Sequence, residues 1–170
     1  ALHYSFVVKK NTLLNITQIK NMIKNHSKKV PGTCIEVEGL GVIFRGPTGI
    51  GKSDLALRLI DSGACLIADD FTELAIENGI LIARAPKTIR HLLEVRGIGI
   101  LKIDSALQVK LGVIIDLVKP EQVERRPEDQ SVEILGKHIP LFHLFPLEAS
   151  GPIKVRLIVR QLKGEVLNIP

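Results

Sequence analysis

Eight consecutive residues have the types and the spacing of a phosphate-binding loop. They are Gly46, Pro47, Thr48, Gly49, Ile50, Gly51, Lys52 and Ser53, and they fit the pattern G-x-x-x-x-G-K-[ST]. In this pattern the backbone N–H groups of the glycine turn converge on an anionic phosphate. The lysine reaches the β- and γ-phosphates, and the serine hydroxyl binds Mg²⁺. The sequence therefore predicts a site for ATP and Mg²⁺.

The flanking segments predict the strand and the helix that such a loop requires. An apolar run from Leu40 to Phe44 leads into the loop, and a helical pattern from Asp54 to Ile60 follows it. The start of that helix would add its positive end to the anion site. This context argues against the alternative, a glycine-rich turn that precedes a lysine by chance.

Two adjacent acids, Asp69 and Asp70, are the best candidates to bind the metal and to orient or deprotonate the hydroxyl that accepts the phosphate. They follow an apolar strand, Ala64 to Ala68, which is expected beside the strand of the loop. Ligand sites in open α/β sheets lie at the carboxyl ends of strands. Adjacent residues point in opposite directions, so one carboxylate would face the metal and the other the attacking hydroxyl. Repulsion between them would raise one pKa and favour a base. The alternative is a solvated acidic turn.

A second charged pair, Glu94 and Arg96, lies inside an apolar stretch. Charges in such a stretch cost free energy unless they are paired or bind a metal. Glu94 would complete the ligand shell of Mg²⁺, and Arg96 would neutralise phosphate charge. Spacing alone leaves a structural ion pair between Glu94 and Arg96 equally open.

Composition bounds the function classes. The chain has 170 residues, 45% apolar and 24% charged, which is typical of one soluble domain or of one domain with an appendage. The formal charge of +5 suits a solvated basic face or an acidic partner. No basic groove with interleaved aromatic residues is evident, so nucleic acid is not an expected partner. No run is long enough for a membrane span and no signal peptide is visible, so a cytoplasmic protein is expected, with Cys34 and Cys65 as buried free thiols.

The remaining pattern predicts an α/β fold with a mixed sheet. Apolar residues at helical spacing predict a helix over 13–29, either an amphipathic cap or a docking helix. Asn78-Gly79 between two apolar runs predicts a β-hairpin. Ile89 to Leu93 is ambiguous between helix and strand, and the charged segment Lys119 to Gln130 predicts a mobile surface loop. The other expected elements are strands at Thr33 to Val37, Leu111 to Val118, Val132 to Leu135 and Ile139 to Leu144, and a closing helix at Pro152 to Leu162.

Three segments taken in order resemble the catalytic domain of HPr kinase/phosphorylase. They are GPTGIGKSD (46–54), LIADD (66–70) and LEVRGIGIL (93–101), and Ile134-Leu135-Gly136 with Ile139-Pro140 resembles a later element of that family. The resemblance runs from about residue 31 to 146, and LEVRGIGIL is its most specific part. It implies a P-loop kinase domain with a mixed sheet over 31–170 and an N-terminal extension over 1–30. The chain resembles a short form with the catalytic domain alone.

The resemblance also implies an activity. Members of the family use ATP to phosphorylate a serine of the phosphocarrier protein HPr, and many also run phosphorolysis of the phosphoserine. By resemblance, Lys52 binds the β-phosphate, Ser53 and Glu94 hold Mg²⁺, Asp69 is the proton acceptor for the substrate serine, and Arg125 stabilises charge on the transferring group. A homo-oligomer, a hexamer in the family, is expected. Two other functions stay open: a small-molecule kinase, and a nucleotide-binding sensor with little catalysis.

Two departures from the family pattern bear on catalysis. The catalytic histidine of the family aligns with Pro31, whose side chain cannot transfer a proton. Slower catalysis, or help from another residue, is therefore expected; His26 or His91 could in principle substitute, but a lone surface histidine is the favoured interpretation of each. The arginine-containing V-R-P-G-R stretch, associated with phosphorolysis, is replaced by residues 145–150, which include Glu148. An acidic residue in place of arginines weakens phosphate binding, so weak or absent phosphorylase activity is predicted.

Overall fold

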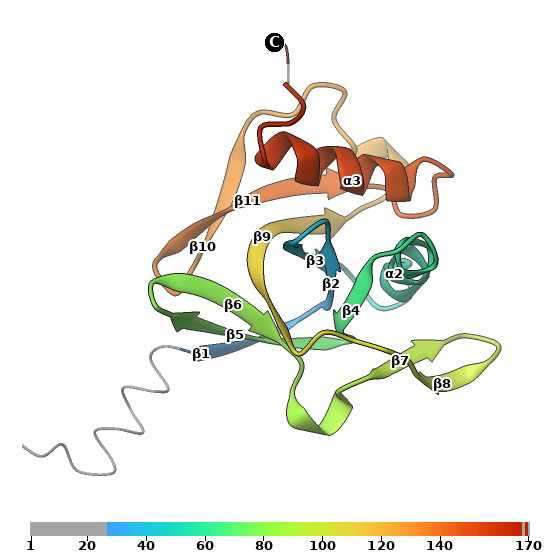
Figure 1. Ribbon diagram of the computed structural model, residues 1–170. Coiled ribbons are helices and arrows are strands. Elements are labelled where there is room, and N and C mark those ends of the chain that lie inside the picture. The colour runs from blue at the N-terminus through green and yellow to red at the C-terminus, as the bar shows by residue number, and fades with distance from the viewer. Residues whose placement is uncertain (1–26, 168, 170) are drawn as a thin grey trace, which may run out of the picture.

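The computed structural model describes residues 27–167 and residue 169 (Figure 1). Most of the helix predicted over 13–29, and His26, lie outside the described residues. Residues 27–29 are the exception, and for them the helix prediction is wrong. They belong to a strand, Ser27–Pro31, which pairs antiparallel with Phe71–Glu77.

The described chain is mostly β-strand, with two α-helices and two short 3₁₀ helices. The strands are β1 (Ser27–Pro31), β2 (Thr33–Val37), β3 (Leu40–Arg45), β4 (Cys65–Ala68), β5 (Phe71–Glu77), β6 (Ile80–Arg84), β7 (Leu92–Val95), β8 (Gly99–Lys102), β9 (Gln108–Leu117), β10 (Gln130–Ile134) and β11 (Lys137–Leu144). The helices are α2 (Lys52–Asp61), η1 (Lys87–Ile89), η2 (Pro120–Gln122) and α3 (Gly151–Leu162).

The long strand β9 joins the parts of a curled mixed sheet. Its second half runs parallel to β3 on one side and to β11 on the other. Its first half pairs antiparallel with β6, which continues through β5 to β1. Beyond β3 the sheet extends through β2 to β4, so the prediction that the strand before the two acids lies directly beside the strand of the loop is wrong. Because one strand serves both parts, the β6–β5–β1 part turns away below the β3–β9–β11 part (Figure 1).

The sheet buries a hydrophobic cluster on each face. One cluster lies between the sheet and the helices α2 and α3, and it includes Phe44, Ile115 and Val155, each fully buried. The other includes Ile43, Ile114 and residues of β5, β6 and β10. Burial on both faces explains why Val42 to Phe44 of β3 and Val113 to Ile115 of β9 are continuous apolar runs, whereas the first half of β9 alternates. The predicted α/β fold with a mixed sheet is confirmed.

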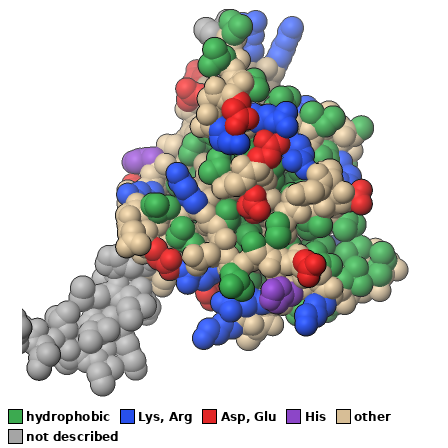
Figure 2. Space-filling view, in the orientation of Figure 1, with side chains coloured by type: hydrophobic (Ala, Val, Ile, Leu, Met, Phe, Trp, Pro, Cys, Tyr) green, Lys and Arg blue, Asp and Glu red, His purple; other side chains and the backbone are tan. Residues whose placement is uncertain are grey.

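Strands β7 and β8 form a separate two-stranded ribbon, which projects beside α2 (Figure 1). Leu93 on the inner face of the ribbon is fully buried in the core. At the other end, Ile98 and Ile100 have 71% and 70% of their surface exposed, and hydrophobic side chains are visible at the tip (Figure 2). The ribbon is therefore attached to the domain by one of its two faces.

Most of the predicted elements are confirmed with boundaries shifted by a few residues. The hairpin at Asn78-Gly79 joins β5 to β6, and the closing helix is α3. The ambiguous segment Ile89 to Leu93 divides between the end of η1 and the start of β7. The predicted loop at Lys119 to Gln130 contains the single turn η2. Both cysteines are free: Cys34 is fully buried, which raises the pKa of its thiol, and Cys65 is half-buried.

None of the helices in the described part of the chain is both long enough and apolar enough to cross a bilayer.

Candidate functional site

The phosphate-binding loop lies between the carboxyl end of β3 and the start of α2. Arg45, the last residue of β3, donates two hydrogen bonds of 2.7 Å to the carboxylate of Asp116 on β9, which fixes the strand where the loop begins. Gly46 has φ +148°, and a Cβ atom there would lie 3.0 Å from the carbonyl oxygen of Leu117. The loop therefore leaves the sheet through a position where only glycine fits.

The start of α2 is open to an anion. Gly51 precedes the helix with φ +114°, and no side chain caps the first turn. The N–H groups of that turn therefore remain available to an external acceptor. Lys52 folds back over the loop, and its Nζ donates to the carbonyl oxygens of Gly46 at 3.0 Å and Pro47 at 3.1 Å. The ammonium group thus lies inside the loop, where a phosphate would offer it a charged acceptor.

The carboxylate of Asp69 connects three separate segments. The residue is buried, with only 6% of its surface exposed. Its Oδ1 accepts hydrogen bonds from Thr33 Oγ1 at 2.9 Å and from Ser53 Oγ at 3.3 Å. Its Oδ2 accepts one from the backbone N–H of Glu94 at 3.2 Å. These bonds hold β2, the first turn of α2 and the β7–β8 ribbon at fixed positions around the end of β4.

Asp70 is in a different environment although it is the next residue. It has φ +58°, it is exposed, and it lines a cavity together with Lys52 and Glu94. Partial withdrawal of its carboxyl group from water, and repulsion by Asp69 and Glu94, raise the pKa of Asp70, while Lys52 opposes the shift. This agrees with the prediction that one of the two adjacent acids has a raised pKa.

The cavity over the phosphate-binding loop has a volume of about 310 Å³. It brings together loop residues with Asp70, Glu94 and Arg96, whereas Asp69 is not among the described residues that line it. Arg96 lies close to the loop: its Nη2 atom is 3.9 Å from the position that a Cβ atom would take at Gly49. Within the described residues no ion pair joins Glu94 to Arg96, and both line the cavity. The lining residues are Thr48, Gly49, Gly51, Lys52, Ser53, Asp54, Asp70, Glu94, Arg96 and Leu147.

The oxygen atoms of Ser53 and Glu94 that line this cavity fit Mg²⁺. Across residues 27–167 and 169, no three His, Cys, Asp or Glu side chains are grouped to hold a metal ion by themselves. Mg²⁺ does not require such a group, because it usually takes one or two carboxylates and completes its shell with phosphates and water. Ser53 and Glu94 line the same cavity as the phosphate-binding loop. A cation there would also relieve the repulsion that raises the pKa of Asp70.

Arg125 is not brought to this cavity. It is exposed in the segment between η2 and β10, and it is absent from the cavity lining among the described residues. The cation that the structure does bring to the loop, besides Lys52, is Arg96.

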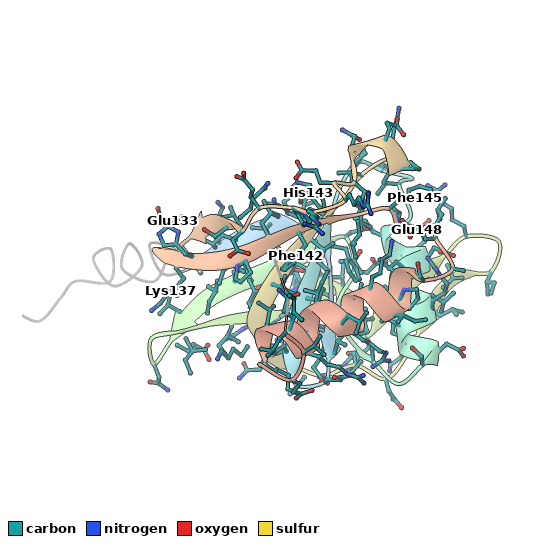
Figure 3. The ribbon with its side chains drawn as sticks, turned by 90° about the horizontal axis from the view of Figure 1, so that it is seen from above. Glu133, Lys137, Phe142, His143, Phe145 and Glu148 are labelled. Atoms are coloured by element: carbon teal, nitrogen blue, oxygen red, sulfur yellow. The ribbon has the colours of Figure 1, made fainter. Side chains whose placement is uncertain are left out.

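The segment 145–150 covers one side of the loop. Leu147 lines the cavity, and a Cβ at Gly51 would lie 3.2 Å from Leu147 and from Pro146. Glu148 lies at the α3 end of this segment (Figure 3), where its carboxylate accepts hydrogen bonds from Lys154 and Ser150. The bond from Lys154 is the main reason why the pKa of Glu148 is lowered. The carboxylate of Glu148 is thus bonded to residues at the start of α3. Leu147 contributes apolar surface to the cavity, in the segment where the resemblance implies arginines.

Three positions differ from, or add to, the sequence reasoning. Pro31 is the cross-strand partner of Phe71, and Gly32 N donates to Asp70 O at 2.8 Å, so the proline lies next to the acids. His91 is not a lone surface residue, because it is half-buried and its Nδ1 is 2.7 Å from Ser105 Oγ. The role of Thr33 was missed, and no local pattern marks it, since its partner is 36 residues away.

Comparisons with known proteins agree on one family. The model of the HPr Serine kinase C-terminal domain matches residues 23–148. An HPr kinase/phosphorylase of Caldicellulosiruptor bescii is 40% identical over 64% of this chain, which covers 39% of that protein. One of Bordetella pertussis is 33% identical over 82% of this chain, which covers 49% of that protein. The chain thus spans less than half the length of these curated relatives.

A solved structure extends this similarity to the fold. The HPr(Ser) kinase/phosphatase from Coxiella burnetii has a TM-score of 0.73 and 28% sequence identity, over 81% of this chain and 92% of that one.

Proposed function

Because the chain belongs to the family of the HPr serine kinase C-terminal domain, we propose that it is an ATP- and Mg²⁺-dependent protein serine kinase. Its acceptor is HPr or an HPr-like phosphocarrier of the phosphotransferase system. One observation carries the proposal: a phosphate-binding loop with its lysine, Arg96, and the acids Asp70 and Glu94 from separate segments line a single cavity. This set matches what phosphoryl transfer requires, namely a grip on the phosphates, charge stabilisation and a group that deprotonates the acceptor.

The loop and Lys52 grip the phosphates of ATP. The open first turn of α2 supplies N–H donors, and the Lys52 ammonium group moves from the loop carbonyls to the β- and γ-phosphates. Ser53 and Glu94 would hold Mg²⁺, which would neutralise charge on the phosphates. Arg96, close to Gly49 of the loop, adds a second positive charge to the cavity.

For the two adjacent acids we propose separate roles. Asp70 takes the proton from the serine hydroxyl, because it lines the cavity beside Lys52 and because its raised pKa makes it the better base. The resemblance alone gave this role to Asp69. The carboxylate of Asp69 already accepts three hydrogen bonds in a buried position, so its part is to position Ser53 and Glu94.

Arg125 can act in phosphoryl transfer only if the segment that carries it moves. It lies on an exposed segment outside the cavity, so it stabilises charge on the transferring group only if that segment approaches the bound nucleotide. Phosphorolysis is proposed to be weak or absent, since Leu147 and the engaged Glu148 occupy the segment where the family pattern carries arginines. We also propose that the protein forms a homo-oligomer and is cytoplasmic.

The test is a phosphotransfer assay with labelled ATP, Mg²⁺ and HPr. The HPr is taken from a bacterium that has one of the related HPr kinase/phosphorylases described above. The expected product is HPr that carries phosphoserine, made by the wild-type chain and not by Lys52→Ala. A panel of small hydroxyl acceptors in parallel separates a protein kinase from a small-molecule kinase. Labelled HPr and unlabelled small acceptors support the proposal, and the reverse refutes it.

One observation favours a second candidate, a nucleotide-binding sensor with little catalysis. Pro31 lies opposite Phe71, and the next residue, Gly32, bonds to Asp70, so position 31 is near the proposed base, but a proline side chain cannot transfer a proton. Under this alternative, nucleotide binds through Lys52 and no acceptor is ever labelled.

A further inference from the structure

We propose that His91 and Ser105 form a clamp that positions Glu94 for the metal of the bound nucleotide. This inference rests on the proposed function, because it assigns the clamp to the Mg²⁺ ligand of the same site. His91 immediately precedes β7, and Ser105 follows β8, so the two residues lie at the open base of the β7–β8 ribbon. The distance between Ser105 Oγ and His91 Nδ1 is 2.7 Å.

The ribbon needs such a clamp because its own pairing is short. Each strand has four residues, and the two strands pair only with one another. An isolated two-stranded hairpin is marginally stable in water. The inner face is anchored by the fully buried side chain of Leu93, and Val95 and Ile103, which are only partly buried, pack against the same cluster. The position of Glu94, one residue after Leu93, depends on what holds the base.

The clamp ties the ribbon to the strand that carries the two acids. Ser105 forms a parallel bridge with Leu66 of β4, and Ala106 N donates to Leu66 O at 3.0 Å. Three residues after Leu66 comes Asp69, whose Oδ2 accepts from the backbone of Glu94. The chain of contacts therefore runs from β4 through Ser105 and His91 into β7, and it closes at Asp69.

The backbone conformation of His91 indicates that contacts with neighbouring residues hold it in place. Its φ is +64°, a left-handed conformation that is uncommon for a residue other than glycine and persists where surrounding contacts over-determine it. Two contacts do so here: the hydrogen bond between the side chains, and a backbone bond from Ile103 N to His91 O at 2.9 Å. His91 lies outside the cavity lining, so it is a positioning residue and not a catalytic one.

The experiment measures nucleotide binding and not turnover. The dissociation constant of a fluorescent ADP analogue is determined by titration, once with Mg²⁺ and once with EDTA, and the ratio of the two values gives the gain due to the metal. His91→Ala and Ser105→Ala are expected to reduce this gain at least fivefold while the value in EDTA stays within twofold of wild type. His91→Asn is expected to restore most of the gain, because asparagine tolerates a positive φ and its amide can bond to Ser105.

His138→Ala is the matched control, since this exposed histidine lies on β11 and does not line the cavity of the phosphate-binding loop. Unchanged metal gain in both alanine variants overturns the inference. So does an equal loss with Mg²⁺ and with EDTA, which indicates general damage to the site. Because the readout is binding, it stays informative even if no phosphotransfer to HPr is ever found, and the failure of the proposed function is thereby kept separate.

Discussion

The two sides of the nucleotide cavity are built in contrasting ways. The phosphate-binding loop lies between β3, buried in the middle of the sheet, and α2, and its parts are contiguous in sequence. The opposite wall is the β7–β8 ribbon, which projects from the domain and carries Glu94 and Arg96 (Figure 1). The first wall is held by a whole sheet, and the second by Leu93, the Asp69–Glu94 bond and the His91–Ser105 bond.

The contrast suggests a division of labour. Under the proposed function, the wall formed by β3, the loop and α2, here called the rigid wall, would bind the phosphates through backbone groups and Lys52 with or without the metal. The ribbon wall would supply the groups whose position decides whether the metal is held and whether phosphate charge is neutralised. Substitutions on the first wall should therefore abolish binding, whereas those on the second should affect the response to Mg²⁺.

The largest effect is expected on the rigid wall. Lys52→Ala removes the ammonium group that lies inside the loop, and we expect phosphotransfer to fall by roughly 1,000-fold. Equilibrium binding of ATP is expected to weaken with it, whether or not Mg²⁺ is present. Lys87→Ala, an exposed lysine on η1, is the matched control. Transfer that persists in Lys52→Ala would mean that the loop is not the phosphate site.

The second effect concerns the anchor of the ribbon. Leu93→Ala removes a fully buried side chain, which costs about 2–5 kcal/mol of unfolding free energy. Chemical denaturation measures this loss, and Leu107→Ala, at a leucine with 64% of its surface exposed, is expected to cost under about 0.5 kcal/mol. Equal losses in the two variants would show that the ribbon is not attached through Leu93.

The third prediction isolates the metal ligand. Glu94→Gln keeps the size of the side chain and the backbone bond to Asp69, but it removes the charge. We expect the Mg²⁺ concentration for half-maximal activity to rise roughly 10- to 100-fold, with little change in nucleotide binding in EDTA. Glu128→Gln, on an exposed segment away from the loop, serves as the control. An unchanged Mg²⁺ requirement would remove Glu94 from the metal site.

The smallest effect is a change of stability with pH at Asp70. Its pKa is raised in the folded protein, so the charged form is disfavoured there, and stability is lost as the pH rises from the unfolded-state pKa through the folded-state pKa. Asp70→Asn should therefore raise Tm by about 1–2 °C at pH 7 and leave it unchanged near pH 3, where the wild-type carboxyl is protonated. Thermal unfolding at the two pH values checks this, and a variant less stable at pH 7 contradicts it.

The rigid wall is also the part that the sequence revealed. A loop whose eight residues are contiguous, a helix after it and an Asn78-Gly79 hairpin are local patterns, and each was found in place. On the ribbon wall, Glu94 and Arg96 were indicated by residue type, since both interrupt an apolar run. Both line the cavity, and among the described residues they do not form the ion pair that was the alternative.

What failed depended on tertiary context. The rule that adjacent strand residues point in opposite directions does not separate Asp69 from Asp70, because β4 ends at Ala68 and Asp70 has a positive φ. The helix expected over 13–29 is wrong at residues 27–29, where pairing with β5 outweighs helical periodicity. The bond between Thr33 and Asp69 joins residues too far apart for any local pattern.

The separate roles of Asp69 and Asp70 are the centre of this account, and one assay addresses them most directly. Phosphoserine formation on HPr is followed with Asp70→Asn at saturating ATP and Mg²⁺, beside a measurement of ATP affinity for the same variant. The account predicts that ATP affinity stays within a few-fold of wild type while phosphoserine formation falls by roughly 100-fold or more, because general-base catalysis is lost. Phosphoserine formation at the wild-type rate in Asp70→Asn would contradict it.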